Sequence, residues 1–172
     1  VDVNEKDIKG WTPLMFACYE NRIEIVKILL KSKDLCVNQV MNDGATALIL
    51  ASEKCHVEIV RLLLSKSEID INKTQKNGAT ALIIASEKGH VEVVHLLLSK
   101  SDIDINKAMK EEYTALFMAS QNGHVEVVRL LLSKSEIDIN KARDDGYTSL
   151  CMASQKGHVE VVRLLLSKSE ID

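Results

Sequence analysis

The sequence predicts an all-α solenoid, a stack of short helix–turn–helix units with projecting turn loops. A sequence motif recurs every 34 residues. Its period is seen in the threonines Thr12, Thr46, Thr80, Thr114 and Thr148 and in the histidines His56, His90, His124 and His158. Each copy holds two short apolar segments of helical character, separated by glycine or polar residues. A fixed period of this length indicates small units that are stabilised by packing on their neighbours.

The first half of one unit reads as a turn followed by a short helix. Asn77 and Gly78 favour a turn, because glycine reaches positive φ freely and asparagine tolerates it. Thr80 then stands where a helix N-cap belongs. Residues 81–88 are predicted to form the helix, and Gly89 to end it in the left-handed conformation.

The second half of the unit reads as another helix and an extended loop. Residues 91–99 are predicted to be helical, and their apolar positions cover more than one face, so this helix is expected to be buried on more than one side. Both helices are shorter than the roughly 12–15 residues needed for independent stability. Residues 103–107 alternate between apolar and polar types and are expected to run as extended chain to the next turn.

This unit resembles the ankyrin repeat, and the resemblance covers the whole chain in five copies. It is carried by Gly78-Ala79-Thr80-Ala81-Leu82 with Ala85, then Gly89-His90, then Val93-Val94 with Leu96-Leu97-Leu98, and then Asp104-Ile105-Asn106. The resemblance implies a single ankyrin-repeat domain over 1–172, with repeats at approximately 5–38, 39–72, 73–106, 107–140 and 141–172. Because the chain starts and stops in the same connecting loop, we expect a segment of a longer array.

The sequence departs from the ankyrin pattern in the period and in two glycine positions. The period is 34 residues, where the family value is about 33. The extra residue falls in the loop where Ser67, Ser101 and Ser135 stand, so we expect the second helix to end differently. Cys55 replaces a helix-ending glycine. Glu112 replaces a turn glycine, and we expect it to be strained at positive φ or to move the turn.

Composition limits the classes of protein to consider. Apolar residues make up 46% of the 172 residues, which excludes disorder from low hydrophobicity. The net charge is −3, and without a long basic run we expect no nucleic-acid partner. We also expect no membrane partner, because the apolar runs are too short to span one. The four cysteines form no Cys-x-x-Cys pair, which favours free thiols and a cytoplasmic location, or a nuclear one.

Repeated polar residues could suggest chemistry, but their spacing favours a structural role. Equivalent histidines of stacked units should lie roughly 8–10 Å apart, whereas zinc ligands lie about 2 Å from their metal. The repeated serines have no converging base and orienting group. We therefore predict no enzyme, no catalytic residue, no metal site and no cofactor.

The positions that vary within the fixed frame point to binding. The resemblance implies that partners contact the turn tips and the first helices, on the concave face. The predicted partner-binding residues are Trp11, Tyr19, Asn42, Asp43, Lys76, Asn77, Lys110, Glu111, Tyr113, Asp144, Asp145 and Tyr147. Four of the six aromatic residues of the chain are in this set. Tyrosine and tryptophan commonly anchor protein interfaces, although large turn residues also serve simply to cover backbone.

These observations favour a protein–protein interaction scaffold or adaptor with a protein partner. Two alternatives remain open at this point. The chain could be a regulatory or targeting segment of a larger multidomain enzyme or channel, or an engineered array without a native partner. The apolar positions of residues 159–166 are expected to be uncovered by any sixth repeat, which predicts weak self-association through the uncapped ends.

Overall fold

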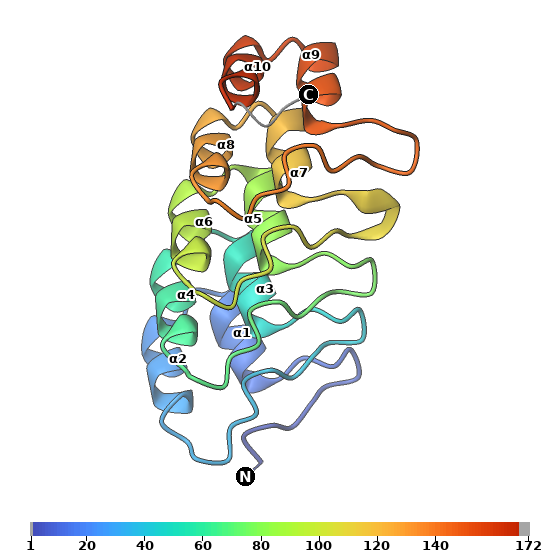
Figure 1. The fold of residues 1–172 in the computed structure, drawn as a ribbon. Helices are drawn as coiled ribbons and strands as arrows, with labels where there is room; N and C mark the ends of the chain where they lie inside the picture. The colour runs from blue at the N-terminus through green and yellow to red at the C-terminus, as the bar shows by residue number, and fades with distance from the viewer. Residues whose placement is uncertain (1, 169–172) are drawn as a thin grey trace.

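Two parallel columns of helices form the molecule, and a row of hairpin-like loops projects from one side (Figure 1). The computed structural model describes residues 2–168. Within that range the inner column consists of α1 (Pro13–Tyr19), α3 (Ala47–Glu53), α5 (Ala81–Lys88), α7 (Ala115–Gln121) and α9 (Ser149–Lys156). The outer column consists of α2 (Ile23–Leu29), α4 (Val57–Leu64), α6 (Val91–Leu98), α8 (Val125–Leu132) and α10 (Val159–Leu166). The predicted all-α solenoid is confirmed, while the exact repeat boundaries stay a prediction.

The inner helices begin where the sequence predicted. In each repeat the threonine hydroxyl accepts a hydrogen bond from the backbone N–H three residues on, as in Thr80 to Ile83 at 3.2 Å. This bond satisfies one of the free N–H groups at the helix start. Gly89 ends α5 with φ of 73°, in the left-handed region that glycine enters without steric cost.

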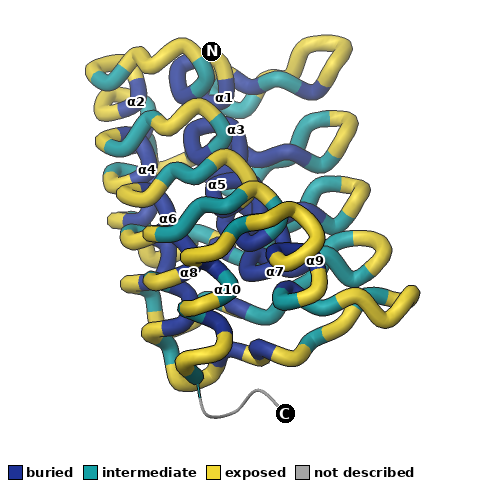
Figure 2. The backbone as a smooth tube through the Cα atoms, turned by 90° about the horizontal axis from the view of Figure 1, so that it is seen from above, coloured by how far each residue is buried: buried dark blue, intermediate teal, exposed yellow. Residues whose placement is uncertain are grey.

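The core lies between the two columns and along the inner one (Figure 2). Small residues such as Ala51, Ala85 and Ala119 let successive inner helices approach closely, and all three are fully buried. The outer helices contribute valine and leucine side chains from their inward faces. Because neither column could bury its apolar surface alone, the helices depend on the stack for stability.

The histidines have a structural role, as predicted. The Nε2 atom of each one contacts a backbone carbonyl at the end of the preceding inner helix: His56 to Tyr19 at 3.0 Å, His90 to Glu53 at 3.1 Å, His124 to Glu87 at 2.8 Å and His158 to Gln121 at 3.0 Å. The rings of His124 and His158 also lie against the helix-ending glycine of the preceding repeat. A Cβ on Gly89 would stand 2.7 Å from Nδ1 of His124, so a larger residue there would require the ring to shift, whereas Asn21 and Cys55 occupy the equivalent positions with φ of 56° and 59°.

The extra residue of the 34-residue period is accommodated in an ordered loop. Four of the five outer helices end on a serine in the right-handed helical conformation, whose hydroxyl donates to the carbonyl three residues back, as in Ser99 to Leu96 at 2.6 Å, whereas α2 ends at Leu30. One asparagine per repeat then joins its loop to the next. The Nδ2 atom of Asn72 donates to the carbonyl of Asp102 at 2.7 Å, and its Oδ1 atom accepts from the N–H of Asp104 at 2.8 Å.

The same pair of bonds recurs down the array, and we call this series the asparagine ladder. It comprises Asn4, Asn38, Asn72 and Asn106, each bonded to the backbone of the following repeat. Each rung fixes a backbone acceptor and a backbone donor that would otherwise face solvent. The longer loop is therefore part of the contact between repeats.

The four cysteines are free, in agreement with the prediction from their spacing. Cys18 is buried in α1, and burial raises the pKa of its thiol to about 12, which keeps it neutral. It stands where later repeats have a serine. The hydroxyls of Ser52, Ser86 and Ser120 are buried, and the described residues offer them no hydrogen-bond partner.

Candidate functional site

The turn tips form one edge of the molecule, on the opposite side of the inner helices from the outer column (Figure 1). Backbone hydrogen bonds join successive tips: Asn42 N to Lys9 O at 3.0 Å, Lys76 N to Asp43 O at 2.8 Å, and Lys110 N to Asn77 O at 2.9 Å. The tips of the first four repeats therefore form a continuous strip. Most of the predicted partner-binding residues lie on this strip or directly beside it, and Tyr19 lies at the end of α1.

Several of these polar residues also hold the turns together. The carboxylates of Asp43 and Asp145 accept backbone N–H bonds from Ala45 and Tyr147, at 2.9 and 3.2 Å. Asn77 does the same for Ala79 at 3.0 Å. These bonds are typical of Asx turns, so the residue type at these positions is explained by the fold.

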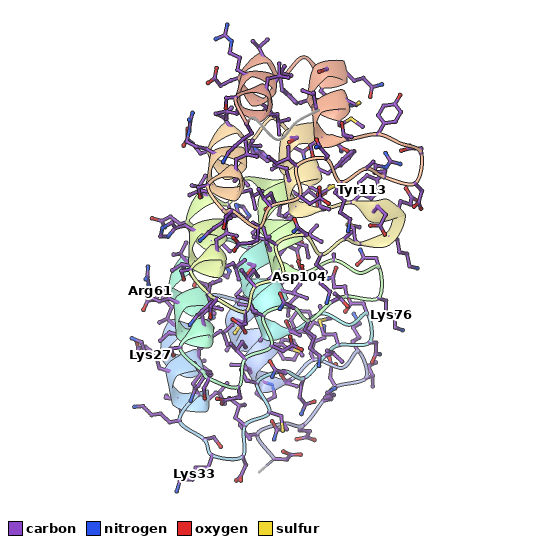
Figure 3. The ribbon with its side chains drawn as sticks, in the orientation of Figure 1. Lys27, Lys33, Arg61, Lys76, Asp104 and Tyr113 are labelled. Atoms are coloured by element: carbon purple, nitrogen blue, oxygen red, sulfur yellow. The ribbon has the colours of Figure 1, made fainter. Side chains whose placement is uncertain are left out.

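The remaining polar tip residues differ in their surroundings. Asn42 donates from Nδ2 to the carbonyl of Ile8 at 3.0 Å and thereby links two tips. Lys76, Lys110 and Asp144 are exposed, and no side-chain hydrogen bond to them occurs in the described structure. Lys76 projects from the end of its tip in Figure 3.

An aromatic cluster lies at the N-terminal end of the strip. The ring of Trp11 stacks on Phe16, with centroids 4.8 Å apart and planes at 25°, and meets the edge of Tyr19 at 5.3 Å. The ammonium group of Lys54, from the next repeat, lies 4.3 Å from the centroid of Tyr19. Trp11 and Tyr19 are among the predicted partner-binding residues, whereas Phe16 is not.

Phe16 differs in exposure from every equivalent residue. Its relative exposure is 48%, whereas Leu50, Ile84, Met118 and Met152 are at most 8% exposed. The one signal in the sequence was that a single aromatic stands in a column of aliphatic residues. Its contact with Trp11 could not be inferred from periodicity, because the two residues occupy different phases of the repeat.

A second cluster joins the tips of repeats four and five. The guanidinium of Arg143 lies 4.4 Å from the ring centroid of Tyr113 and 5.6 Å from that of Phe117. It pairs with Glu111 at 3.6 Å and with Asp145 at 3.2 Å. The side chain is only 17% exposed. Its Nε atom is buried, and no described residue bonds to it.

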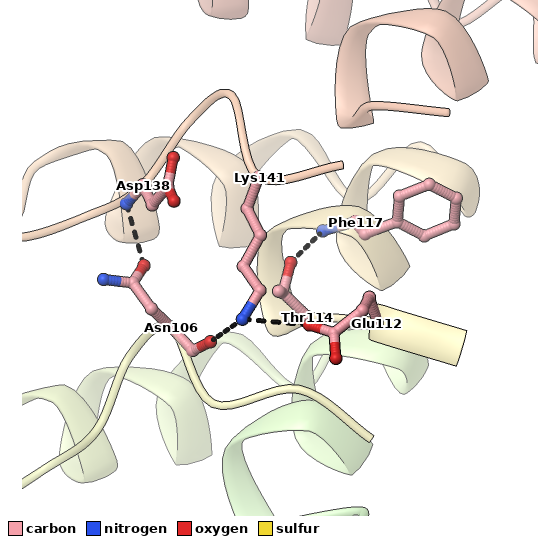
Figure 4. Close-up of polar contacts among 6 residues, drawn as sticks. All are labelled: Asn106, Glu112, Thr114, Phe117, Asp138 and Lys141. Carbon is pink, nitrogen blue, oxygen red and sulfur yellow. Dashed lines mark hydrogen bonds and ion pairs between the residues drawn. The ribbon is translucent and has the colours of Figure 1, made fainter. Parts of the chain in front are cut away.

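A second ion pair supports the same junction. Lys141 binds Glu112 at 3.1 Å and also donates to the backbone carbonyl of Asn106 at 3.2 Å (Figure 4). Lys141 has counterparts in Lys73 and Lys107, whereas Glu112 and Arg143 have none in the earlier repeats. Position 143, for example, corresponds to Met41, Gln75 and Met109.

Of the two outcomes expected at Glu112, positive φ is the one observed, and it extends to the preceding residue. Glu112 has φ of 60° and Glu111 has φ of 63°, so two successive residues with a Cβ occupy the left-handed region. The turn keeps the closing bonds of its relatives, with Met109 N to Tyr113 O at 3.0 Å and Glu112 N to Met109 O at 3.1 Å. The closure of this turn is therefore retained.

The reason for the altered tip is the lack of room for a Cβ. At Gly10, Gly44 and Gly78 a Cβ would stand between 2.8 and 3.0 Å from the following repeat. Glu112 carries that Cβ, so the following tip must lie differently. Within residues 2–168, the backbone bond that joins the earlier tips has no equivalent between Glu111 and Asp144. Side-chain ion pairs replace it.

The middle of the strip is less distinctive. Ala45 and Ala79 occupy the position of Trp11, Tyr113 and Tyr147, and both are buried. A salt bridge of 3.8 Å joins Lys88 to Glu53 across two inner helices. The described residues contain no group of three metal-ligating side chains. No helix in that same part of the chain has the length and apolar character to cross a membrane.

Comparisons with known proteins agree with this architecture. A family model described as ankyrin repeats in three copies matches residues 1–75, 37–109, 67–143 and 104–172. The crystal structure of EF0377, an ankyrin repeat protein, is similar with a TM-score of 0.91 and 32% sequence identity, over 98% of this chain and 86% of that one. No curated protein matches the sequence. The matched segments together span all five repeats, and the chain belongs to the ankyrin repeat family.

Proposed function

We propose that the chain is a protein-binding module whose partner lies along the strip of turn tips and the adjoining inner helices. The observation that carries this proposal is the distribution of aromatic residues. Trp11, Phe16 and Tyr19 gather at one end of the strip, and Tyr113 and Tyr147 lie at the other. Large aromatic side chains that are held in place by neighbours are the usual anchors of protein interfaces.

The equivalent alanines argue against a purely structural role for the aromatics. If a large side chain were needed to cover backbone at the tip, Ala45 and Ala79 would leave that backbone open. Both alanines are nevertheless buried. The frame therefore closes without an aromatic at this position, and Tyr147 remains 41% exposed.

The test compares variants on opposite faces of the molecule. Tyr147→Ala should weaken partner binding by about 1–4 kcal/mol, the range of interface hot spots, with little change in stability. Trp11→Ala and Tyr113→Ala should also weaken binding, but these residues pack in clusters, so their stability must be measured as well. Arg129→Ala on the outer face is the matched control.

The measurement is quantitative mass spectrometry of proteins captured from an extract of the source organism. A partner retained by wild type and Arg129→Ala but lost from Tyr147→Ala supports the proposal. Equal capture by all variants, with normal folding, contradicts it. The family model that matches describes no enzyme, and we infer a non-catalytic module without a cofactor.

Self-association through the flanks stays a prediction, with a smaller surface than the sequence suggested. The expectation that residues 159–166 are uncovered was wrong for Val161 and Leu165, which are fully buried because they point toward the preceding repeat. Val159 and Leu166 are the exposed positions, at 62% and 60%. Residues 169–172 lie outside the described part. Equilibrium sedimentation of wild type against Leu166→Glu would detect any association through this flank.

A further inference from the structure

The outer face carries a feature that the proposed function does not use. In four of the five outer helices, a glutamate in the first turn pairs with a basic residue three positions on. The pairs are Glu24–Lys27 at 2.7 Å, Glu58–Arg61 at 3.6 Å, Glu126–Arg129 at 3.5 Å and Glu160–Arg163 at 3.7 Å. In α6 the basic position is His95, and Glu92 forms no ion pair with any described residue.

A hollow of about 320 Å³ lies beside His95. It is lined by Val91, Leu96 and Leu130, which form an apolar floor, and by Arg61, Glu92 and His95. Residues of three successive outer helices, α4, α6 and α8, thus contribute to one depression. Its volume is at the lower end of the range for ligand pockets, which suits a side chain better than a whole cofactor.

The hollow is where the chain's own arginine would lie. An arginine covers apolar surface with its methylene stem while its guanidinium reaches a carboxylate. Leu96 and Leu130 are partly exposed, as Leu62 and Leu164 also are, and the imidazole of His95 leaves Glu92 without an ion pair to any described residue. Figure 3 shows Arg61 and Lys27 projecting from this outer column, on the opposite side of the molecule from Lys76.

The surroundings favour a cation in this hollow and not in the adjoining one. Arg61 is already neutralised by Glu58 at 3.6 Å. A second hollow, of about 300 Å³, lies on the other side of the same imidazole, but Lys134 is part of its lining. Glu92 is thus the carboxylate left to receive a positive charge at the first hollow.

We propose that the hollow at His95 binds an arginine side chain of a partner protein, which supplies in trans the stem and the charge that α6 lacks. The partner segment would place an apolar residue beside that arginine, against Leu96 and Leu130. This surface lies on the opposite side of the stack from the turn tips, so the chain could hold two partners at once. The inference is independent of the proposed function, because the two surfaces share no residue.

The experiment is an amide NMR titration with two blocked peptides. The first is acetyl-Leu-Arg-Leu-amide, and the second has citrulline, which keeps the shape of arginine without its charge. The arginine peptide should shift the amides of α6 and the middle of α8. The citrulline peptide should bind roughly two- to fivefold more weakly, as expected for loss of one partly exposed ion pair.

Two variants separate recognition from non-specific adhesion. Glu92→Gln should reduce the affinity for the arginine peptide to that of the citrulline peptide. His95→Arg should fill the hollow from within and abolish binding of both peptides, while the fold is retained because three other outer helices carry arginine there. Glu126→Gln removes a carboxylate that is already paired and is the control expected to bind normally.

Three results would overturn the proposal. Equal affinity for both peptides would show that charge is not recognised. Undiminished binding to the folded His95→Arg variant would place the peptide elsewhere. Shifts of the α6 amides with protein concentration alone would make a second copy of the chain the occupant.

Discussion

Successive turn tips are joined differently in two parts of the molecule. One is the junction between repeats two and three, and the other is the junction between repeats four and five. At the earlier junction, Gly44 leaves room for the next tip, and the N–H of Lys76 bonds directly to the carbonyl of Asp43. At the later one, Glu112 takes up that room, and Arg143 and Lys141 hold the tips through ion pairs. The backbone bond requires only that glycine leaves room for it, whereas the ion pairs depend on several particular side chains. The difference shows that the frame tolerates variation where side chains can replace a backbone contact.

The largest change in stability is expected when a glutamate replaces the turn glycine of a regular repeat. Gly78→Glu should destabilise the fold by about 2–4 kcal/mol, the sum of backbone strain and one lost hydrogen bond. Its Cβ would stand 2.8 Å from the Cα of Met109. Gly146→Glu is the control, because nothing lies within 4 Å of its Cβ. It should cost only the strain of positive φ, about 1–2 kcal/mol. Urea melts measure both, and equal losses would mean that close approach contributes nothing.

The next largest change in stability is expected when the ion pairs between repeats four and five are removed. Arg143→Met, which introduces the residue found at Met41 and Met109, should destabilise the protein by about 1–2 kcal/mol through loss of ion pairs and the ring contact. Stability of the wild type should fall as salt is added, and the variant should lose part of that dependence. Arg129→Met, which breaks only an exposed pair, is the control with a change of roughly 0.5 kcal/mol or less. If Arg143→Met were more stable than wild type, the burial of Nε of Arg143 would destabilise the fold by more than the ion pairs and the ring contact stabilise it.

A smaller effect of opposite sign is expected at the strained tip. Glu112→Gly should stabilise the fold by up to about 1 kcal/mol, because relief of strain at positive φ exceeds the added freedom of the unfolded chain. The exposed pair with Lys141 reduces the gain, so the gain should be clearest at high salt. The same variant should alter partner binding near Tyr113. Denaturant melts that show a less stable variant at every salt concentration would refute the strain argument.

The smallest effect concerns the serines of the regular part. Ser86→Ala should be neutral or stabilise the protein by up to about 1 kcal/mol, because its hydroxyl is buried without a hydrogen-bond partner in the described structure. Ser154→Ala, at the equivalent but exposed position in α9, should change nothing. Thermal melts of the two variants give the comparison. A clear loss of stability in Ser86→Ala alone would reveal a hydrogen bond that this structure does not contain.

Most of the fold could be predicted because its determinants lie within one repeat. Thr80 caps the helix that follows it, and Gly89 ends that same helix, so the local pattern contains both signals. The contacts between repeats were harder to predict from the sequence. Asn72 reaches backbone atoms 30 and 32 residues away, and its periodic recurrence alone does not say what it binds.

The strip of turn tips could be predicted in outline from the sequence, whereas its side-chain clusters could not. Trp11 and Tyr113 were chosen for their residue type and phase. Their partners Phe16 and Arg143 stand at positions that are ordinarily aliphatic or polar, so the repeat pattern gave no reason to select them. The left-handed conformation of Glu111 could not be predicted either, because no residue at the equivalent position of another described tip adopts it.

The asparagine ladder has a consequence for how such an array grows. Both bonds of each rung end on backbone atoms of the following repeat, and the histidine bonds end on a backbone carbonyl of the preceding one. Every peptide chain offers these atoms, whatever its side chains. A repeat can therefore be duplicated, deleted or exchanged as a unit without compensating mutations in its neighbours. The junction held by Arg143 and Glu111 lacks this freedom, because the two residues belong to different repeats and must be inherited together.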